Sequence, residues 1–437
     1  MTHPKEALAV ATLGHMQTFI DIEVKNNISP KDNSTAKKEN LPGKRIRKSR
    51  AAPVTRISIE DVVVDQIHES RPRLKSGVHI SKADPKQNRP LVVAAAQTAV
   101  SISHPGARAI VAKFDGLHSP SQISEELKAP IDVVEQVINK LLAAQLLDIK
   151  NTRIKLHNRF QSPIAERAAH TQDQSNDAFF RQLQLRMVPE LSQTTWIENI
   201  VDGGVEILSA RQSFGIEIHG NNRVATLIFA GLLASGVSNT KFSLASRREN
   251  QSIGDTDLGT GVLRINDFGL GYKSRVEELA REWSLFPTAP KGAANTTEPA
   301  ISERNLRVIV GNFQPELIQQ LMRDKSDHLF VGELIGGAAL CGPLVIPEQT
   351  PCHQCLVLTR SEQFGVEELI SLTPLSDEPP VSIAYQMAGL AIASILRFID
   401  TGRSTLTASQ MRFNYSSEPG SEAIRFARHP ACPCNWS

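Results

Sequence analysis

The stretch that decides the fold reads Phe214-Gly215-Ile216-Glu217-Ile218-His219-Gly220-Asn221-Asn222-Arg223-Val224-Ala225. Its first residues form a strand pattern, and a helical pattern follows from the turn to Leu233, with Gly236 at its expected end. A strand that enters a helix through a glycine-containing turn is the context of a nucleotide-binding βα unit. Further strand and helix patterns alternate along residues 205–437, including a candidate strand at Val262–Ile265. The sequence therefore predicts an α/β fold with a doubly wound, mainly parallel, Rossmann-like sheet.

The turn lacks most of the glycines that let a backbone approach phosphate. Gly220 is present, but Asn222 and Ala225 occupy two other glycine positions, and Ser246 stands where an acidic ribose contact is expected. Lys273 is a candidate for contacting a triphosphate, or it is a solvated helix lysine. We therefore take Gly220, Asn222 and Lys273 as candidate cofactor-binding residues and expect a weakened or lost ATP site. No catalytic residue can be assigned.

The five cysteines include two pairs, Cys352-x-x-Cys355 and Cys432-x-Cys434. Two such pairs can supply four thiolates to one tetrahedral zinc ion, which would clip the end of the chain to the middle of the domain. A redox dithiol is the alternative interpretation. Cys341 lies in an apolar stretch and is expected to be a buried small residue, with an acyl- or sulfur-accepting nucleophile as the alternative.

The 437 residues predict two or three folded units. Residues 1–69 are basic and poor in large apolar groups, so we expect a disordered segment, either a solvated tail or an arm for an acidic partner. Residues 70–150 show short strands, three helices and a final strand, which predicts a winged-helix-like module. Residues 151–204 are expected to form a helical connector to the domain at 205–437.

Composition narrows the class of partner. The chain has 48 Lys+Arg against 46 Asp+Glu and is 5% aromatic, which argues against a nucleic-acid ligand. Glycines and a proline interrupt the apolar stretch 329–346, and no secretory signal pattern begins the sequence. Val381–Ile399 is apolar on nearly all sides and predicts a covered helix. We expect a cytoplasmic protein without a membrane partner.

Two motifs resemble a known family. The stretch from Cys341-Gly342-Pro343 to Pro351-Cys352-His353-Gln354-Cys355, with His429-Pro430-Ala431-Cys432-Pro433-Cys434, resembles ThiF-like (ubiquitin-activating-enzyme-like) proteins. The more specific resemblance is to the bacteriocin-biosynthesis cyclodehydratase, or azole-peptide leader-binding, type. It covers about residues 70–437. Residues 71–78 and the three helices after them look like the precursor-peptide recognition module of that family.

The resemblance implies a function. Members of the family bind the leader of a ribosomal precursor peptide and present it to a YcaO-type partner, and several do not adenylate anything. Leader binding by strand addition would involve the strand around Val78–Ile80 and the helix Pro130–Leu142. Asn312 stands near the place of the family's catalytic aspartate, which favours a non-catalytic or weakly catalytic scaffold. The alternative is an ATP-dependent enzyme that adenylates a peptide or small-protein carboxylate, and a DNA-binding regulator ranks lowest. ThiF relatives often pair, so a homodimer is a further expectation.

Overall fold

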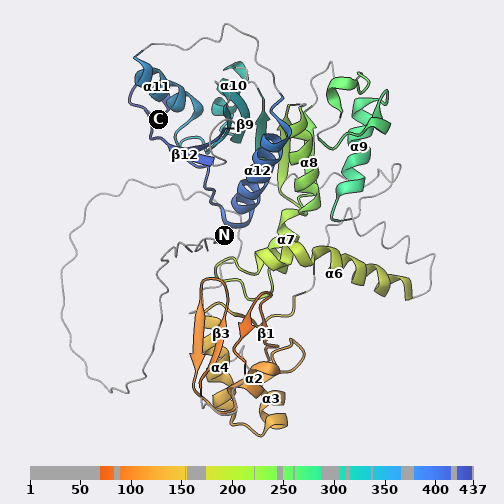
Figure 1. The fold of residues 1–437 in the computed structure, drawn as a ribbon, viewed down its shortest axis with the longest axis vertical. Helices are drawn as coiled ribbons and strands as arrows, with labels where there is room; N and C mark the ends of the chain where they lie inside the picture. Colours follow the sequence, from red (N-terminus) through yellow and green to blue (C-terminus); the bar gives the residue numbers. More distant parts are fainter. Residues whose placement is uncertain are drawn as a thin grey trace, which may run out of the picture. The chain divides into compact units, whose positions relative to one another are not determined.

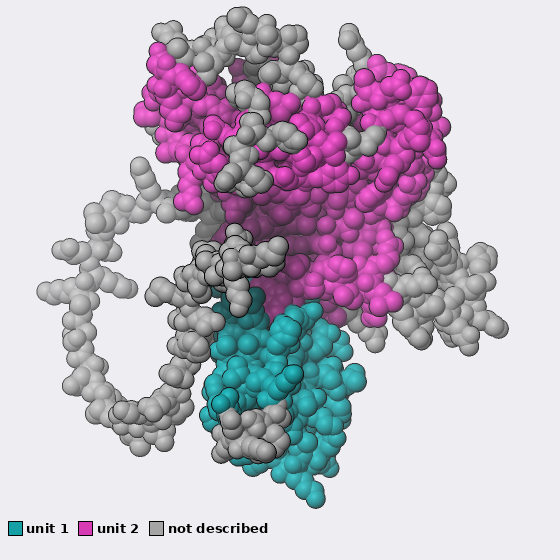
Figure 2. Space-filling view, in the orientation of Figure 1, with its two compact units in different colours: residues 1–151, 198–203 teal, residues 152–197, 204–437 magenta. Residues whose placement is uncertain are grey.

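The computed structural model describes residues 69–82, 89–152, 154, 174–220, 222–243, 250–258, 261–286, 305–311, 315–335, 338–365, 378–414 and 421–435. The expected disordered segment 1–69 lies outside these ranges except for its last residue. The described residues form two compact units, which Figure 2 shows in different colours. Unit 1 contains the described residues up to 151 together with 198–203, and unit 2 contains those of 152–197 and from 204 onward.

Unit 1 combines short strands with three helices (Figure 1). Its strands are β1 (Arg73–Leu74), β2 (His79–Ile80), β3 (Leu91–Ala94), β4 (Ala99–Ile102) and β5 (Leu147–Asp148), and its helices are α2 (Ala107–Ala112), α3 (Pro120–Leu127) and α4 (Ile131–Ala143). The antiparallel sheet β2-β3-β4 and the pair β1-β5 are separate. Ile110, Ile123 and Ile138 are fully buried between the helices and form part of the core of the unit.

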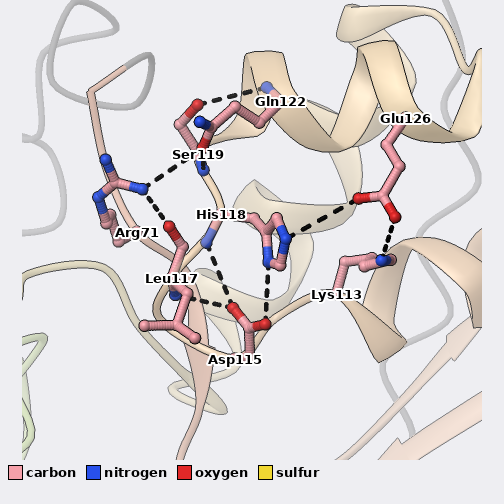
Figure 3. A network of polar contacts seen from close by, with 8 residues as sticks. All are labelled: Arg71, Lys113, Asp115, Leu117, His118, Ser119, Gln122 and Glu126. Atoms are coloured by element: carbon pink, nitrogen blue, oxygen red, sulfur yellow. Dashed lines mark hydrogen bonds and ion pairs between the residues drawn. The ribbon is translucent and has the colours of Figure 1, made fainter.

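Helix α3 begins where the sequence indicates. Ser119 Oγ accepts a hydrogen bond from Gln122 N at 3.3 Å, and Gln122 Oε1 accepts one from Ser119 N at 2.9 Å, which completes a capping box. The preceding loop is held by Asp115, whose carboxylate accepts from Leu117 N at 2.7 Å and lies 2.9 Å from His118 Nδ1 (Figure 3). These hydrogen bonds lower the pKa of Asp115 despite an opposing effect of burial. The loop between α2 and α3 is therefore tied locally, by side chains within a few residues of one another.

Residues 198–203 complete unit 1 from a later part of the chain. Ile149 N and Lys150 N both donate to Val201 O, at 2.8 and 3.0 Å. The fully buried Lys75 ammonium donates to Ile200 O at 2.8 Å and lies 4.0 Å from Asp148. Burial lowers the pKa of Lys75, while the neighbouring carboxylates oppose this change. The unit is thus discontinuous in sequence.

Unit 2 is built around one seven-stranded sheet with the order β12-β11-β10-β9-β8-β6-β7. Its strands are β6 (Gly215–His219), β7 (Asn239–Ser243), β8 (Asn305–Val310), β9 (Asp327–Ile335), β10 (Ala338–Val345), β11 (Ser409–Asn414) and β12 (Ser421–Arg425). Its described α-helices are α6 (Gln174–Thr194), α7 (Val205–Arg211), α8 (Arg223–Ala234), α9 (Tyr272–Trp283), α10 (Pro315–Arg323), α11 (His353–Phe364) and α12 (Val381–Thr401).

The sheet is mixed, so the prediction of a mainly parallel sheet is wrong, although the α/β class is confirmed. Strands β7, β6, β8 and β9 pair in parallel, whereas β10, β11 and β12 join in antiparallel fashion. The chain leaves β6 for β7 on one side and later returns to β8 on the other side. This change of direction lies at the carboxyl end of β6, which is the usual ligand position in such sheets.

Alternate residues of the central strands face two different cores. Val308 and Val310 belong to one core cluster together with residues of α8, α9 and α12, whereas Ile309, between them, belongs to another with residues of α10, α11 and the cysteine loops. Leu329 and Phe330 divide in the same way. Figure 1 shows α8 and α12 side by side, in agreement with their extensive contact. Each face of the sheet therefore carries its own set of helices and its own candidate site.

Among the described residues, α12 is the one helix long and apolar enough to cross a membrane. Met387, Ile395 and Phe398 on this helix are buried in the core of unit 2. The sequence predicted that this helix is covered on most sides. The face that carries these three residues is covered, but Tyr385 on the other face is 54% exposed. Its packing against α8 and the sheet identifies α12 as a core helix of this unit.

Candidate functional site

The four paired cysteines meet in one cluster. Cys352 Sγ lies 3.8 Å from Cys355 Sγ and 3.5 Å from Cys432 Sγ. Cys355 Sγ lies 3.2 Å from Cys434 Sγ, and all four sulfur atoms lie within 4.8 Å of one another. None of these separations is that of a disulfide, which is about 2.05 Å. The geometry thus brings together the two pairs that the sequence singled out.

Four sulfur atoms at these separations can hold one metal ion. In a tetrahedral Zn–S₄ site with bonds of about 2.3 Å, neighbouring sulfurs lie about 3.8 Å apart. Cys352 is the N-cap of α11, and Cys355 lies in its first turn, where the positive end of the helix favours thiolate. Cys432 and Cys434 come from the turn after β12. The donor set fits a structural metal ion, and four thiolates leave no position for a catalytic water.

Three of the four cysteines, Cys352, Cys355 and Cys432, are buried, and Cys434 is partly exposed. Burial raises the pKa of Cys352 to about 11, so a bound cation would have to supply the energy of deprotonation. Burial likewise raises the pKa of Cys432, whereas hydrogen bonds outweigh burial at Cys355 and lower its pKa. His429 Nδ1 accepts from Ala431 N at 3.1 Å, and its Nε2 lies 2.8 Å from a carboxylate oxygen of Glu362. The hydrogen bond to Ala431 N therefore engages Nδ1 of His429 within its own loop.

The second candidate site is the turn between β6 and α8, called here the Gly220 turn. Gly220 has φ = +133°, and a Cβ at this position would lie 2.6 Å from the carbonyl oxygen of Val310 and 2.9 Å from its Cβ. Any larger residue would push β6 away from β8. The glycine is therefore required by the close approach of two strands, whether or not a ligand binds there.

Asn222 caps α8. Its Oδ1 accepts a hydrogen bond from Ala225 N at 3.0 Å, and its backbone is extended, as an N-cap residue requires. Asn222 is 4% exposed. The residue that replaces glycine in the phosphate-binding pattern thus stabilises the start of the helix with its own side chain.

Glu378 places a carboxylate at the same helix start. Both of its oxygens lie 3.3 Å from Arg223 N, and Oε2 lies 2.7 Å from Arg223 Nε. Arg223 Nη1 also donates to Pro379 O at 3.4 Å. The first residue of α8 is thus held, through backbone and side chain, by the segment that leads into α12.

Lys273 lies in the first turn of α9 and is exposed, on a different element from the Gly220 turn. Ser246 and Asn312, at the other positions compared with nucleotide-binding enzymes, lie outside the described residues. Cys341 is fully buried in β10, as expected, and burial raises its pKa to about 12. Sequence reasoning missed Arg223 and Glu378. Arg223 occupies a position of the turn pattern that admits any residue, so the pattern carried no signal for it.

Comparisons with known proteins agree with the fold. No family model matches the chain, and the search of curated proteins finds no similar sequence. Among solved structures, E. coli MccB bound to ATP is 14% identical with a TM-score of 0.51, and the match covers 83% of this chain and 99% of that one. The microcin C7 biosynthetic enzyme MccB in complex with N-formylated MccA is 12% identical with a TM-score of 0.52 and covers 83% of this chain and 99% of that one. The heterocyclase TruD is 12% identical with a TM-score of 0.45, covering 84% of this chain and 42% of that one. The chain has the same overall α/β fold as MccB.

Proposed function

We propose that this protein binds the leader of a ribosomal precursor peptide and presents it to a YcaO-type cyclodehydratase in azole-peptide or bacteriocin biosynthesis. In this proposal it is a non-catalytic or weakly catalytic ThiF-like scaffold with a structural zinc ion. The shared fold with MccB, whose solved complexes contain MccA or ATP, supports a place in peptide modification. A cytoplasmic location without a membrane or nucleic-acid partner, and pairing of two copies, belong to the same proposal.

The observation that carries the proposal is the edge of the small sheet in unit 1. Strand β4 pairs with β3 on one side, and on its other side no strand pairs with it among the described residues. Helix α4 packs against β4. A peptide added to this edge would gain backbone hydrogen bonds from β4 and apolar contacts from α4, as in recognition by strand addition. Although β2 is also an edge strand, we propose the β4 edge because α4 lies against it.

The register shows which backbone groups of β4 are available. Val92 N donates a hydrogen bond to Ser81 Oγ at 3.0 Å, and Val92 O accepts one from Ser81 N at 2.8 Å. Both backbone groups of Val92 therefore point toward β2. Its partner Ser101 is therefore in a non-hydrogen-bonded pair, and the N–H and C=O of Ser101 point away from β3. Ala99, two residues earlier, has the same orientation. These two residues would form the hydrogen bonds to an added strand.

Ser101→Pro tests the proposal with little damage to the sheet. Proline removes an N–H that the β3–β4 ladder does not use, so an edge strand tolerates it. Tagged full-length wild type, Ser101→Pro and the control Ser101→Ala would be used to capture peptides and enzymes from the source cytoplasm, with identification by mass spectrometry. We expect a precursor peptide and a YcaO-type enzyme with wild type and Ser101→Ala, and loss of the peptide with Ser101→Pro. Equal peptide recovery with Ser101→Pro would exclude the β4 edge.

The second candidate function is ATP-dependent adenylation of a peptide or small-protein carboxylate. The fold shared with ATP-bound MccB favours it. ATP–pyrophosphate exchange with the captured peptide would distinguish the two functions. The scaffold proposal predicts no exchange above background, and an exchange activity abolished by Lys273→Ala would support adenylation instead.

A further inference from the structure

The start of α8 already holds an anion, which belongs to the chain itself. Both oxygens of Glu378 lie 3.3 Å from Arg223 N, and Oε2 is 2.7 Å from Arg223 Nε. The N-terminus of a helix attracts negative charge, because its first N–H groups lack partners within the helix. In a nucleotide-binding βα unit, phosphate takes this position after the first strand.

The position of Glu378 is fixed by the fold. Pro379 and Pro380 follow it, and Pro380 is the N-cap of α12, so two restricted φ angles join the carboxylate to a core helix. Ile383 and Ala384, in the first turns of α12, are buried in the same core as α8. The bond from Arg223 Nη1 to Pro379 O adds a second connection. The carboxylate is therefore held at α8 by the packing of two helices.

The charge of the pair opposes binding of a further anion. Glu378 neutralises the Arg223 side chain, which is 22% exposed, and also lies against the first amide of α8. A triphosphate at this position would have to displace a carboxylate that is connected to the core, or bind beside its negative charge.

We propose that Glu378 is an internal substitute for a nucleotide phosphate, an autoinhibitory contact that keeps the Gly220 turn closed to triphosphates. This inference goes beyond leader binding, since it concerns a different unit and a different ligand. Changing this one side chain should open the helix start to an anion, because β6, Gly220 and the amide of Arg223 are in place, even though Asn222 and Ala225 replace two of the glycines of the pattern.

A charge series at position 378 tests the inference in the full-length protein. Isothermal titration calorimetry with Mg·ATP, and separately with inorganic triphosphate, would compare wild type with Glu378→Gln, Glu378→Ala and Glu378→Lys. We expect the affinity for both probes to rise about tenfold in the neutral variants, with a further increase in Glu378→Lys, because each change removes one negative charge beside the bound anion. Glu422→Ala is the matched control, since Glu422 is an exposed acid paired with Arg412 on another part of the sheet at 3.5 Å. It should bind both probes like wild type.

Two results would overturn the inference. Wild type binding both probes as tightly as the position-378 variants would show that Glu378 does not close the turn. No binding by any folded variant would show that the turn is not a phosphate site even when Glu378 is removed. Glu378→Gln, which keeps the size of the side chain, gives the answer if Glu378→Ala fails to fold. Peptide capture by the same variants should be unchanged, so failure here is distinguishable from failure of the leader-binding proposal.

Discussion

The starts of α11 and α8 offer an informative comparison, because they belong to opposite faces of one sheet and both receive negative or potentially negative groups. At α11, Cys352 and Cys355 meet two cysteines from the end of the chain. At α8, the carboxylate of Glu378 takes the position of an external anion. The same preference of a helix N-terminus would thus serve the proposed metal clip on one face and the proposed internal closure on the other.

The largest expected effect comes from removing the metal ligands. Wild type should contain about one zinc per chain, and Cys352→Ser or Cys434→Ser should lose it, with a destabilisation of about 5 kcal/mol or more. Metal analysis and urea unfolding would measure both. Cys341→Ala, at a buried cysteine outside the cluster, should keep its zinc. A metal-free wild type that is as stable as the zinc-loaded protein would contradict a structural role of the metal at the start of α11.

The second-largest effect concerns the face of the sheet that carries α8 and α12, and it tests whether this face can be destabilised without loss of the metal. Arg211, which is 3% exposed, forms bonds of 2.8 and 2.6 Å with Asp400 near the end of α12. Asp400→Ala would leave a buried guanidinium without its main partner and should cost about 3–5 kcal/mol in urea unfolding. Zinc content should not change. Loss of zinc in this variant would show that the two faces unfold as one.

Acid should act on the cysteine face through His328. Burial lowers the pKa of His328 to about 4, despite the hydrogen bond to Ser326 O at 2.7 Å. In the unfolded chain the ring takes up a proton near pH 6.5, so stability is full above this pH and falls as the pH drops toward 4, by up to about 3 kcal/mol. His328→Asn keeps a donor for Ser326 O and should show a smaller decrease over this window. Comparing both proteins at each pH separates this effect from protonation of the cysteines, and identical pH profiles would contradict it.

The smallest effect concerns the stability contribution of the Glu378 contact. Arg223 and Glu378 side chains are 22% and 32% exposed, so this pair should contribute less than about 1 kcal/mol to the free energy of unfolding. A double-mutant cycle with Arg223→Gln and Glu378→Gln would measure it. A coupling of several kcal/mol would mean that the contact serves the fold, and would weaken the contrast between the closed turn and the metal clip.

Signals within a short stretch of sequence predicted much of unit 2. The strand–turn–helix at Gly220, the core helix α12 and the two cysteine loops each follow from neighbouring residues. The direction of the strands could not be predicted in this way. The fully buried β10 has the continuous apolar pattern of a parallel strand, but it pairs antiparallel on both sides. An apolar run indicates burial on two faces and carries no information about direction.

Two further features of the structure differ from what the sequence predicted, one for a local reason and one because of a distant residue. The expected strand Val262–Ile265 is absent, because Asp267 Oδ2 accepts from Arg264 N at 2.6 Å and stabilises a 3₁₀ turn from Ile265. Asp267 Oδ1 also accepts from Arg275 Nε at 2.7 Å. Glu378 could not be found from the sequence of the Gly220 turn, because it is 155 positions from Arg223 and only the tertiary fold brings them together.

The return of residues 198–203 to unit 1 determines how that unit can be isolated. A fragment that ends at residue 150 would lose the carbonyl groups that receive Lys75 Nζ and the amides of Ile149 and Lys150. The buried ammonium and the two amides would lose these hydrogen bonds, which would lower the free energy of unfolding of a small domain that has little stability to lose. An excised fragment should therefore extend to residue 203, and a protease cut between 152 and 197 should leave two pieces that stay associated.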